Sequence, residues 1–137
     1  MGWPKFEVDE HGTHFTVLLF DEYVIKVRRR KKKDVRKYDV KEIVEIQNEL
    51  AEHLEEILPC ERISRGCIVM PRIYGTPGRR LIKGHKRQAE NLLTELQNKV
   101  RSLGFVPNDI NLENIIYRDG KIYLIDCHRI ERVSYED

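Results

Sequence analysis

The sequence has 137 residues, 35% of them charged, and its 25 lysines and arginines nearly balance 23 aspartates and glutamates. This length predicts one compact domain (1–137), with a core but without the two full lobes of a large enzyme. The formal net charge of +2 does not by itself indicate nucleic-acid binding. Three cysteines without a CxxC pair argue against a disulfide framework. No apolar run approaches membrane-spanning length, so we expect a reducing, cytoplasmic setting without a membrane span.

The first part of the chain is typical of a small antiparallel sheet. KFEV (5–8), THFTVLLF (13–20) and YVIKV (23–27) are rich in β-branched and aromatic residues and are separated by polar turns. The short turn DE predicts that residues 13–27 form an antiparallel hairpin.

Two helices and a second hairpin are predicted in the remainder. The first helix runs from about Asp39 to Leu58, where Pro59 stops it, and we expect it to pack on the first hairpin through Leu50 and Leu54. A second helix, roughly Lys86–Leu103, ends before Gly104. The other predicted elements are a buried strand (67–70), a turn-rich segment (71–80), and a hairpin of NIIY (114–117) and KIYLID (121–126) around an Asp-Gly turn. This order predicts an α+β fold, not an alternating βαβ fold.

Three short polar side chains flank the last hairpin. Asp109 precedes it, Asn114 stands at its mouth and Asp126 at its far end. Because a hairpin returns the chain to its starting point, these residues can converge. Asn114 and Asp126 then offer oxygen ligands to Mg²⁺, and Asp109 can accept a proton from an attacking hydroxyl. This is the division of roles that phosphoryl transfer requires.

Five segments, in order, resemble landmarks of the protein-kinase-like superfamily. YVIKV looks like the strand with the kinase lysine, and IVEIQNELAEHL like the helix with its glutamate partner. CIVMPRIYG falls where a kinase strand leads into the hinge. NDINLEN is similar to the catalytic loop and YLIDCH to the metal-binding Asp segment, so the likeness spans about residues 13–128.

The resemblance implies a minimal kinase-like fold, with a small antiparallel N-lobe sheet and one packed helix (1–70), a hinge (71–85) and a C-lobe reduced to one main helix and the catalytic hairpin (86–137). It implies ATP and Mg²⁺ as cofactors. Lys26 would hold the α/β-phosphates, and Met70 and Ile73 would lie at the adenine site. Asp109 would be catalytic, and Asn114 and Asp126 would hold the metal. LIDCHR is most similar to small-molecule and lipopolysaccharide-core sugar kinases, which implies transfer to a non-peptide hydroxyl or another small acceptor.

The glutamate that pairs with Lys26 is not fixed by spacing. An apolar helical stripe is formed by Ile43, Ile46, Leu50, Leu54 and Ile57. Glu42 and Glu49 border this stripe and can reach interior groups, whereas Glu45 and Glu52 point into solvent. Glu49 is closest to the family pattern and is our choice; Glu42 is second.

Departures from the family pattern keep two alternatives open. The first turn contains a single glycine (Gly12), Pro107 replaces the usual His, and only eleven residues follow Asp126. These features favour a catalytically weak or inactive, kinase-like protein that binds a nucleotide or a partner. A third alternative, a basic nucleic-acid-binding module, rests on the run at 28–37, which predicts an anionic partner.

Overall fold

In the computed structural model, which describes residues 7–9, 15–29 and 39–134, the chain divides into two compact units. The first contains residues 1–45 and 59–72, and the second residues 46–58 and 73–137. The single-domain organisation with a hinge at 71–85 stays a prediction. Of the basic run, only Arg28 and Arg29 are described, so the anionic-partner prediction for 28–37 falls largely outside the described residues, as does the turn at Gly12.

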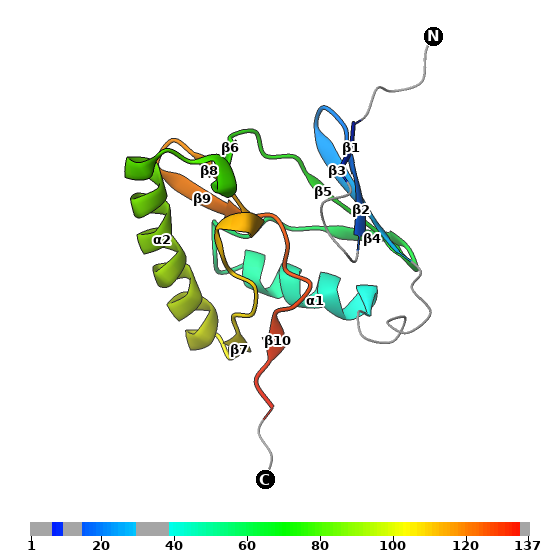
Figure 1. The fold of residues 1–137 in the computed structure, drawn as a ribbon. Helices are drawn as coiled ribbons and strands as arrows, with labels where there is room; N and C mark the ends of the chain where they lie inside the picture. Colours follow the sequence, from blue (N-terminus) through cyan, green and yellow to red (C-terminus); the bar gives the residue numbers. More distant parts are fainter. Residues whose placement is uncertain (1–6, 10–14, 30–38, 135–137) are drawn as a thin grey trace. The chain divides into compact units, whose positions relative to one another are not determined.

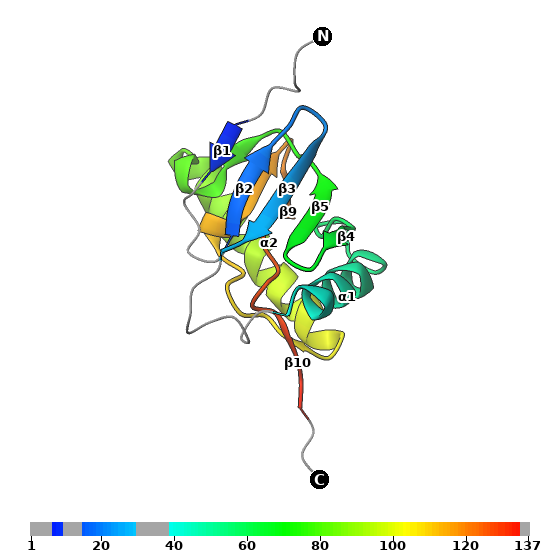
Figure 2. The ribbon, with the colours of Figure 1, turned by 90° about the vertical axis from the view of Figure 1, so that its right-hand side faces the viewer.

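The first unit contains a five-stranded antiparallel sheet in the order β1-β2-β3-β5-β4 (Figure 2). Its strands are β1 (Glu7–Asp9), β2 (Phe15–Leu19), β3 (Tyr23–Arg28), β4 (Glu61–Ser64) and β5 (Cys67–Pro71). The predicted hairpin is confirmed over the described residues, because β2 pairs with β3 from Phe15↔Arg28 to Leu19↔Val24. Strand β4 was not predicted; its four residues are all exposed, so the sequence has no alternation there.

Helix α1 is shorter than predicted. It begins at Val40, after Asp39 accepts the Lys41 backbone N–H at 3.0 Å, but it ends at Ala51, seven residues before Leu58. The chain leaves the helix because its next residues pair with another strand: the Leu124 N–H donates to the Glu56 carbonyl at 2.8 Å, and Ile57 forms a parallel bridge with Leu124. Leu50 and Leu54 lie in the core of the second unit, and their predicted packing on the first hairpin stays a prediction.

The second unit is built on helix α2 (Lys83–Ser102) and the hairpin of β8 (Ile115–Arg118) and β9 (Lys121–Leu124), which lie side by side (Figure 1). Asp119 and Gly120 both have positive φ, 49° and 77°, the backbone of a two-residue type I′ turn. Helix α2 starts three residues before its predicted beginning. Its inward face and the hairpin share one apolar core, which includes Ala89, Leu93, Leu96, Val100, Ile115, Ile122 and Leu124.

Short elements join the hairpin to the rest of the second unit. Strand β6 (Thr76–Pro77) pairs with β8, and β7 (Phe105–Val106) pairs with β10 (Glu131–Arg132). Two 3₁₀ turns, η1 (Gly78–Arg80) and η2 (Leu112–Asn114), pack together. Among the described residues, no helix is both long enough and apolar enough to cross a membrane.

Candidate functional site

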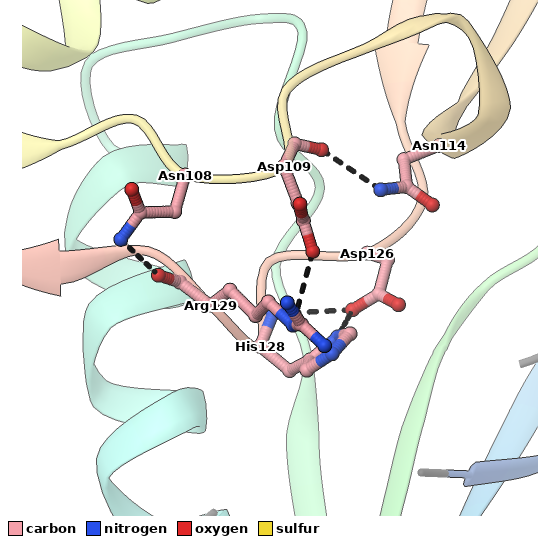
Figure 3. A network of polar contacts seen from close by, with 6 residues as sticks. All are labelled: Asn108, Asp109, Asn114, Asp126, His128 and Arg129. Carbon is pink, nitrogen blue, oxygen red and sulfur yellow. Dashed lines mark hydrogen bonds and ion pairs between the residues drawn. The ribbon is translucent and has the colours of Figure 1, made fainter. Parts of the chain in front are cut away.

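Two loops of the second unit lie together at the open end of the β8–β9 hairpin. One runs from Pro107 to Asn114, and the other follows β9 from Ile125 to Ile130. The β7–β10 ladder brings their bases together, with Val106 opposite Glu131. The Asn108 amide then donates to the Arg129 carbonyl at 3.1 Å, which fastens one loop to the other (Figure 3).

Asp109 has a left-handed backbone, with φ at 58°. Few residues other than glycine adopt this conformation, although Asp does so more readily than most. Its Oδ2 atom lies 3.0 Å from Arg129 Nε, and both side chains remain partly exposed, at 39% and 45%. The carboxylate is therefore held by a cation while solvent still reaches it.

Asn114 lies next to Asp109 through a direct hydrogen bond. Its Nδ2 donates to the Asp109 carbonyl at 2.8 Å. Asn114 is the last residue of the 3₁₀ turn η2, which is capped by Asn111, whose Oδ1 accepts from the Glu113 N–H at 3.1 Å. Because the amide nitrogen faces Asp109, the Oδ1 atom of Asn114 points away from that carbonyl (Figure 3).

Asp126 lies two residues after the end of β9 and is joined to Asn114 through the neighbouring residue, since the Ile125 N–H donates to the Asn114 carbonyl at 2.8 Å. The Asp126 Oδ1 accepts the His128 backbone N–H at 3.1 Å and also contacts His128 Nδ1. The structure thus brings the three predicted residues Asp109, Asn114 and Asp126 into one network.

His128 and Arg129 were not identified as site residues from the sequence. The His128 side chain is only 9% exposed and its ring is directed at Asp126. The only sequence signal was their position immediately after the predicted metal-binding Asp. The ion pair of Arg129 with Asp109 depends on the β7–β10 ladder, and strands of two residues cannot be recognised from the sequence.

The donor set fits magnesium better than a transition metal. Within the described ranges, no group of three His, Cys, Asp or Glu side chains could hold a metal ion. Mg²⁺ does not need such a cage, because it usually takes one or two carboxylates and completes its shell with waters and substrate phosphates. The two predicted ligands, the Asp126 carboxylate and the Asn114 amide oxygen, are of the kind that Mg²⁺ takes.

Lys26 lies in the first unit at the centre of the sheet, opposite Val17 on β2 and Ile68 on β5. It is a buried lysine, with 9% of its surface exposed. Its charge also acts on Cys60, which is buried: burial raises the pKa of the Cys60 thiol to about 11, and Lys26 partly opposes that rise. Met70, on the same sheet, is buried as well.

Glu49 lies in the second unit and already has a cationic neighbour there. Its Oε2 atom is 2.7 Å from Nη2 of Arg132, on β10, and the Arg132 guanidinium lies over the Phe105 ring at 5.3 Å. Glu42 is exposed in the first turn of α1, and Ile73 is partly buried. The pairing of Lys26 with Glu49 or Glu42 and the adenine contacts stay predictions.

Two solved structures share this fold. Rio2 kinase from Chaetomium thermophilum, solved as an ADP/Mg²⁺–phosphoaspartate complex, matches with a TM-score of 0.65 at 16% identity, over 92% of this chain and 49% of that one. Rv3197 from Mycobacterium tuberculosis, solved with erythromycin, matches with a TM-score of 0.72 at 14% identity, over 93% and 46%. The chain has a protein-kinase-like fold.

The kinase-like chain spans about half the length of both matched proteins. No family model matches its sequence, and no curated protein matches it. At these identities the likeness establishes the fold alone. The finer resemblance to sugar kinases stays a prediction.

The environment of Cys60 in this kinase-like chain predicts selective thiol chemistry. The thiolate is the reactive form, and a pKa of about 11 leaves little of it at pH 8. Cys67, on β5, is partly exposed. We expect iodoacetamide to alkylate Cys67 at least about tenfold faster than Cys60 in the folded protein at pH 8, and the two rates to converge in urea. Peptide mass spectrometry measures both, and equal rates in the folded protein would contradict the buried placement of Cys60.

Proposed function

We propose that the chain is an ATP- and Mg²⁺-dependent phosphotransferase that acts on a non-peptide hydroxyl or another small acceptor. The observation that carries this proposal is the network of Asp109, Asn114 and Asp126 at the mouth of the β8–β9 hairpin, within a kinase-like fold. Phosphoryl transfer depends chiefly on positioning and on stabilising charge, so a rigid set of oxygen ligands beside a proton acceptor is the apparatus it needs.

Asp109 has the role of orienting the acceptor hydroxyl and accepting its proton. A general base must lie within hydrogen-bond reach of the proton and must be ionised. The ion pair with Arg129 at 3.0 Å limits the rotation of the Asp109 carboxylate, while the 39% exposure of the Asp109 side chain leaves room for an acceptor. The hydrogen bond from Asn114 to the Asp109 carbonyl holds the left-handed backbone in place.

Asn114 Oδ1 and the Asp126 carboxylate would hold the magnesium ion. The Asn114 amide is oriented by its donation to Asp109, and Asp126 is oriented by both contacts from His128. Bound there, the ion would supply positive charge against the phosphates. Lys26 would bind the α/β-phosphates, Glu49 would orient Lys26, and Met70 and Ile73 would contact adenine. The ADP/Mg²⁺ complex of the Rio2 kinase supports this choice of cofactors.

The test is a pair of measurements on the same protein. Calorimetric titration should show that the chain binds ATP and that Mg²⁺ strengthens this binding. With ATP labelled in its γ-phosphate, the labelled phosphoryl group should be transferred slowly to water and faster to a suitable acceptor. A screen of sugars and other small hydroxyl compounds then identifies the acceptor. Failure of ATP to bind with or without Mg²⁺ would overturn the proposal.

A second candidate is a kinase-like protein that binds a nucleotide or a partner without turnover. It is favoured by the carboxylates that are already engaged: Asp109 is paired with Arg129, and Glu49 with Arg132. In this case the nucleotide would bind, with or without magnesium dependence, while labelled phosphate would stay on ATP with every acceptor.

A further inference from the structure

Residues 73–89, which link β5 to α2 and form its first two turns, contain no aspartate or glutamate. Over the same stretch the sequence places five cations, Arg79, Arg80, Lys83, Lys86 and Arg87, together with His85. The whole chain is nearly balanced in charge, so this concentration of one sign is local. The function proposed above does not use it.

These five cations are exposed and lie close together in the fold of the second unit. Arg79 and Arg80 are in η1, and the other three are in the first turns of α2. Lys83, Lys86 and Arg87 are spaced i, i+3 and i+4, so they share one side of the helix. Among the residues that the structure describes, none of the five forms an ion pair. The patch therefore presents positive charge that is not paired with any carboxylate in the described part of the chain.

The position of these cations is unfavourable for the isolated helix. The N-terminus of a helix carries partial positive charge, and acidic residues usually stabilise the first turn. Helix α2 has none there, and its N-cap residue, Ile82, makes no side-chain capping hydrogen bond. A bound anion would relieve both the charge repulsion and the uncapped backbone N–H groups.

An apolar side chain stands within this patch. Ile82 is 68% exposed, more than any other large hydrophobic residue in the described ranges, and Tyr74 is 52% exposed. Leu81, by contrast, packs against the core of the second unit. The backbone at Ile82 is thus anchored by its neighbour while the Ile82 side chain faces water.

We propose that this patch, which consists of the five cations between Arg79 and Arg87 and the exposed Ile82 among them, docks onto the surface of an anionic phospholipid membrane. Clustered lysines and arginines are attracted to anionic headgroups, and an apolar side chain can enter the boundary between headgroups and acyl chains. Nucleic-acid phosphates would explain the cations but give no role to an exposed isoleucine. The observations therefore favour a lipid surface over RNA or DNA.

Vesicle co-sedimentation tests the proposal with the whole chain. Binding to phosphatidylcholine vesicles should rise steeply when phosphatidylserine is included and should fall with added salt. Replacing Arg79, Arg80, Lys83 and Lys86 by Gln should weaken binding by about a hundredfold or more, since each cation contributes about 1 kcal/mol, or roughly fivefold, near an anionic surface. Ile82→Ser should weaken it by about tenfold, because the apolar contribution is lost.

Matched variants separate the patch from general effects. Replacing Arg62, Arg65, Arg101 and Lys121 by Gln removes the same charge from other exposed positions, and Ile63→Ser removes an isoleucine that is 53% exposed on β4. Both should retain wild-type binding, and circular dichroism checks that all variants fold. Equal losses in the control variants would overturn the proposal. The proposal would also be overturned if Ile82→Ser bound vesicles as the wild type does and if single-stranded RNA bound to the wild type but not to the variant that lacks the four cations. That result would assign the patch to nucleic acid.

Discussion

Asp126→Asn is expected to remove the magnesium-dependent part of ATP binding, while Asp109→Asn is expected to leave binding intact and remove turnover. Asp126 would contribute the only full negative charge among the proposed metal ligands. Substitutions of residues that only orient metal ligands often weaken metal binding by about tenfold or more, so the loss of Asp126 should weaken ATP binding in the presence of Mg²⁺ by at least about tenfold. Asp109→Asn keeps the shape of the side chain but not the proton acceptor, and turnover should fall by about two to four orders of magnitude. Thermal shift with ATP, with and without Mg²⁺, measures the first effect, and transfer of labelled phosphate measures the second.

Asp119→Asn is the matched control for both variants. Asp119 lies at the tip of the same hairpin with its side chain 93% exposed, and its positive φ of 49° suits Asn as well as Asp. It should therefore bind ATP and transfer phosphate as the wild type does. Asn114→Ala should lie between the two site variants, because it removes one neutral ligand that water can replace. If Asp126→Asn retained full magnesium dependence, the metal-site assignment would be wrong even if turnover were lost.

The elements that could be predicted from sequence are those fixed by local signals. The Asp119–Gly120 turn determines the β8–β9 hairpin because both residues accept positive φ. Helix α2 follows from the spacing of Ala89, Leu93, Leu96 and Val100, which places all four on one buried face. In these segments the local preference and the final environment agree.

The end of α1 could not be predicted because a non-local contact decides it. Leu54 and Ile57 continue the helical period of Leu50, and both are buried, but they reach the core from non-helical backbone. The hydrogen bond from Leu124 to the Glu56 carbonyl replaces helical hydrogen bonds that the sequence favours. The sequence near Glu56 contains no signal that its carbonyl will accept a hydrogen bond from Leu124, which is 68 residues later in the chain.

In the candidate site, too, some residues could be predicted from local sequence signals and others could not. The convergence of Asp109, Asn114 and Asp126 could be predicted because their chemistry and their positions around a hairpin are visible in the sequence. Arg129 and His128 orient two of them, yet each depends on a geometry that the sequence does not display. Arg129 meets Asp109 only because the two-residue ladder of β7 and β10 brings the loops together. The His128 ring turns toward Asp126 in a bend without regular secondary structure.

Gly78→Ala is expected to destabilise the second unit and to disturb the site from a distance. A Cβ atom on Gly78 would lie 2.0 Å from the Leu112 carbonyl oxygen and 2.8 Å from Ile115 Cγ1. Because the first clash is with backbone, a side-chain rotation cannot relieve it, and η1 must separate from η2. We expect the free energy of unfolding to fall by about 3 kcal/mol, at the upper end for an overpacked core, as measured by urea denaturation.

The consequence for function follows from what η2 carries. Asn114 is its last residue, so a displaced η2 should weaken the hydrogen bond from Asn114 to Asp109, and with it magnesium-dependent ATP binding, even at temperatures where the variant remains folded. Gly84→Ala is the matched control: no atom lies within 4 Å of its added Cβ, and alanine in the first turn of α2 should raise the free energy of unfolding by about 0.5 kcal/mol or less. Opposite signs for the two substitutions would support the close contact of η1 with η2. A Gly78→Ala variant as stable as the wild type would show that this contact does not hold Asn114 in place.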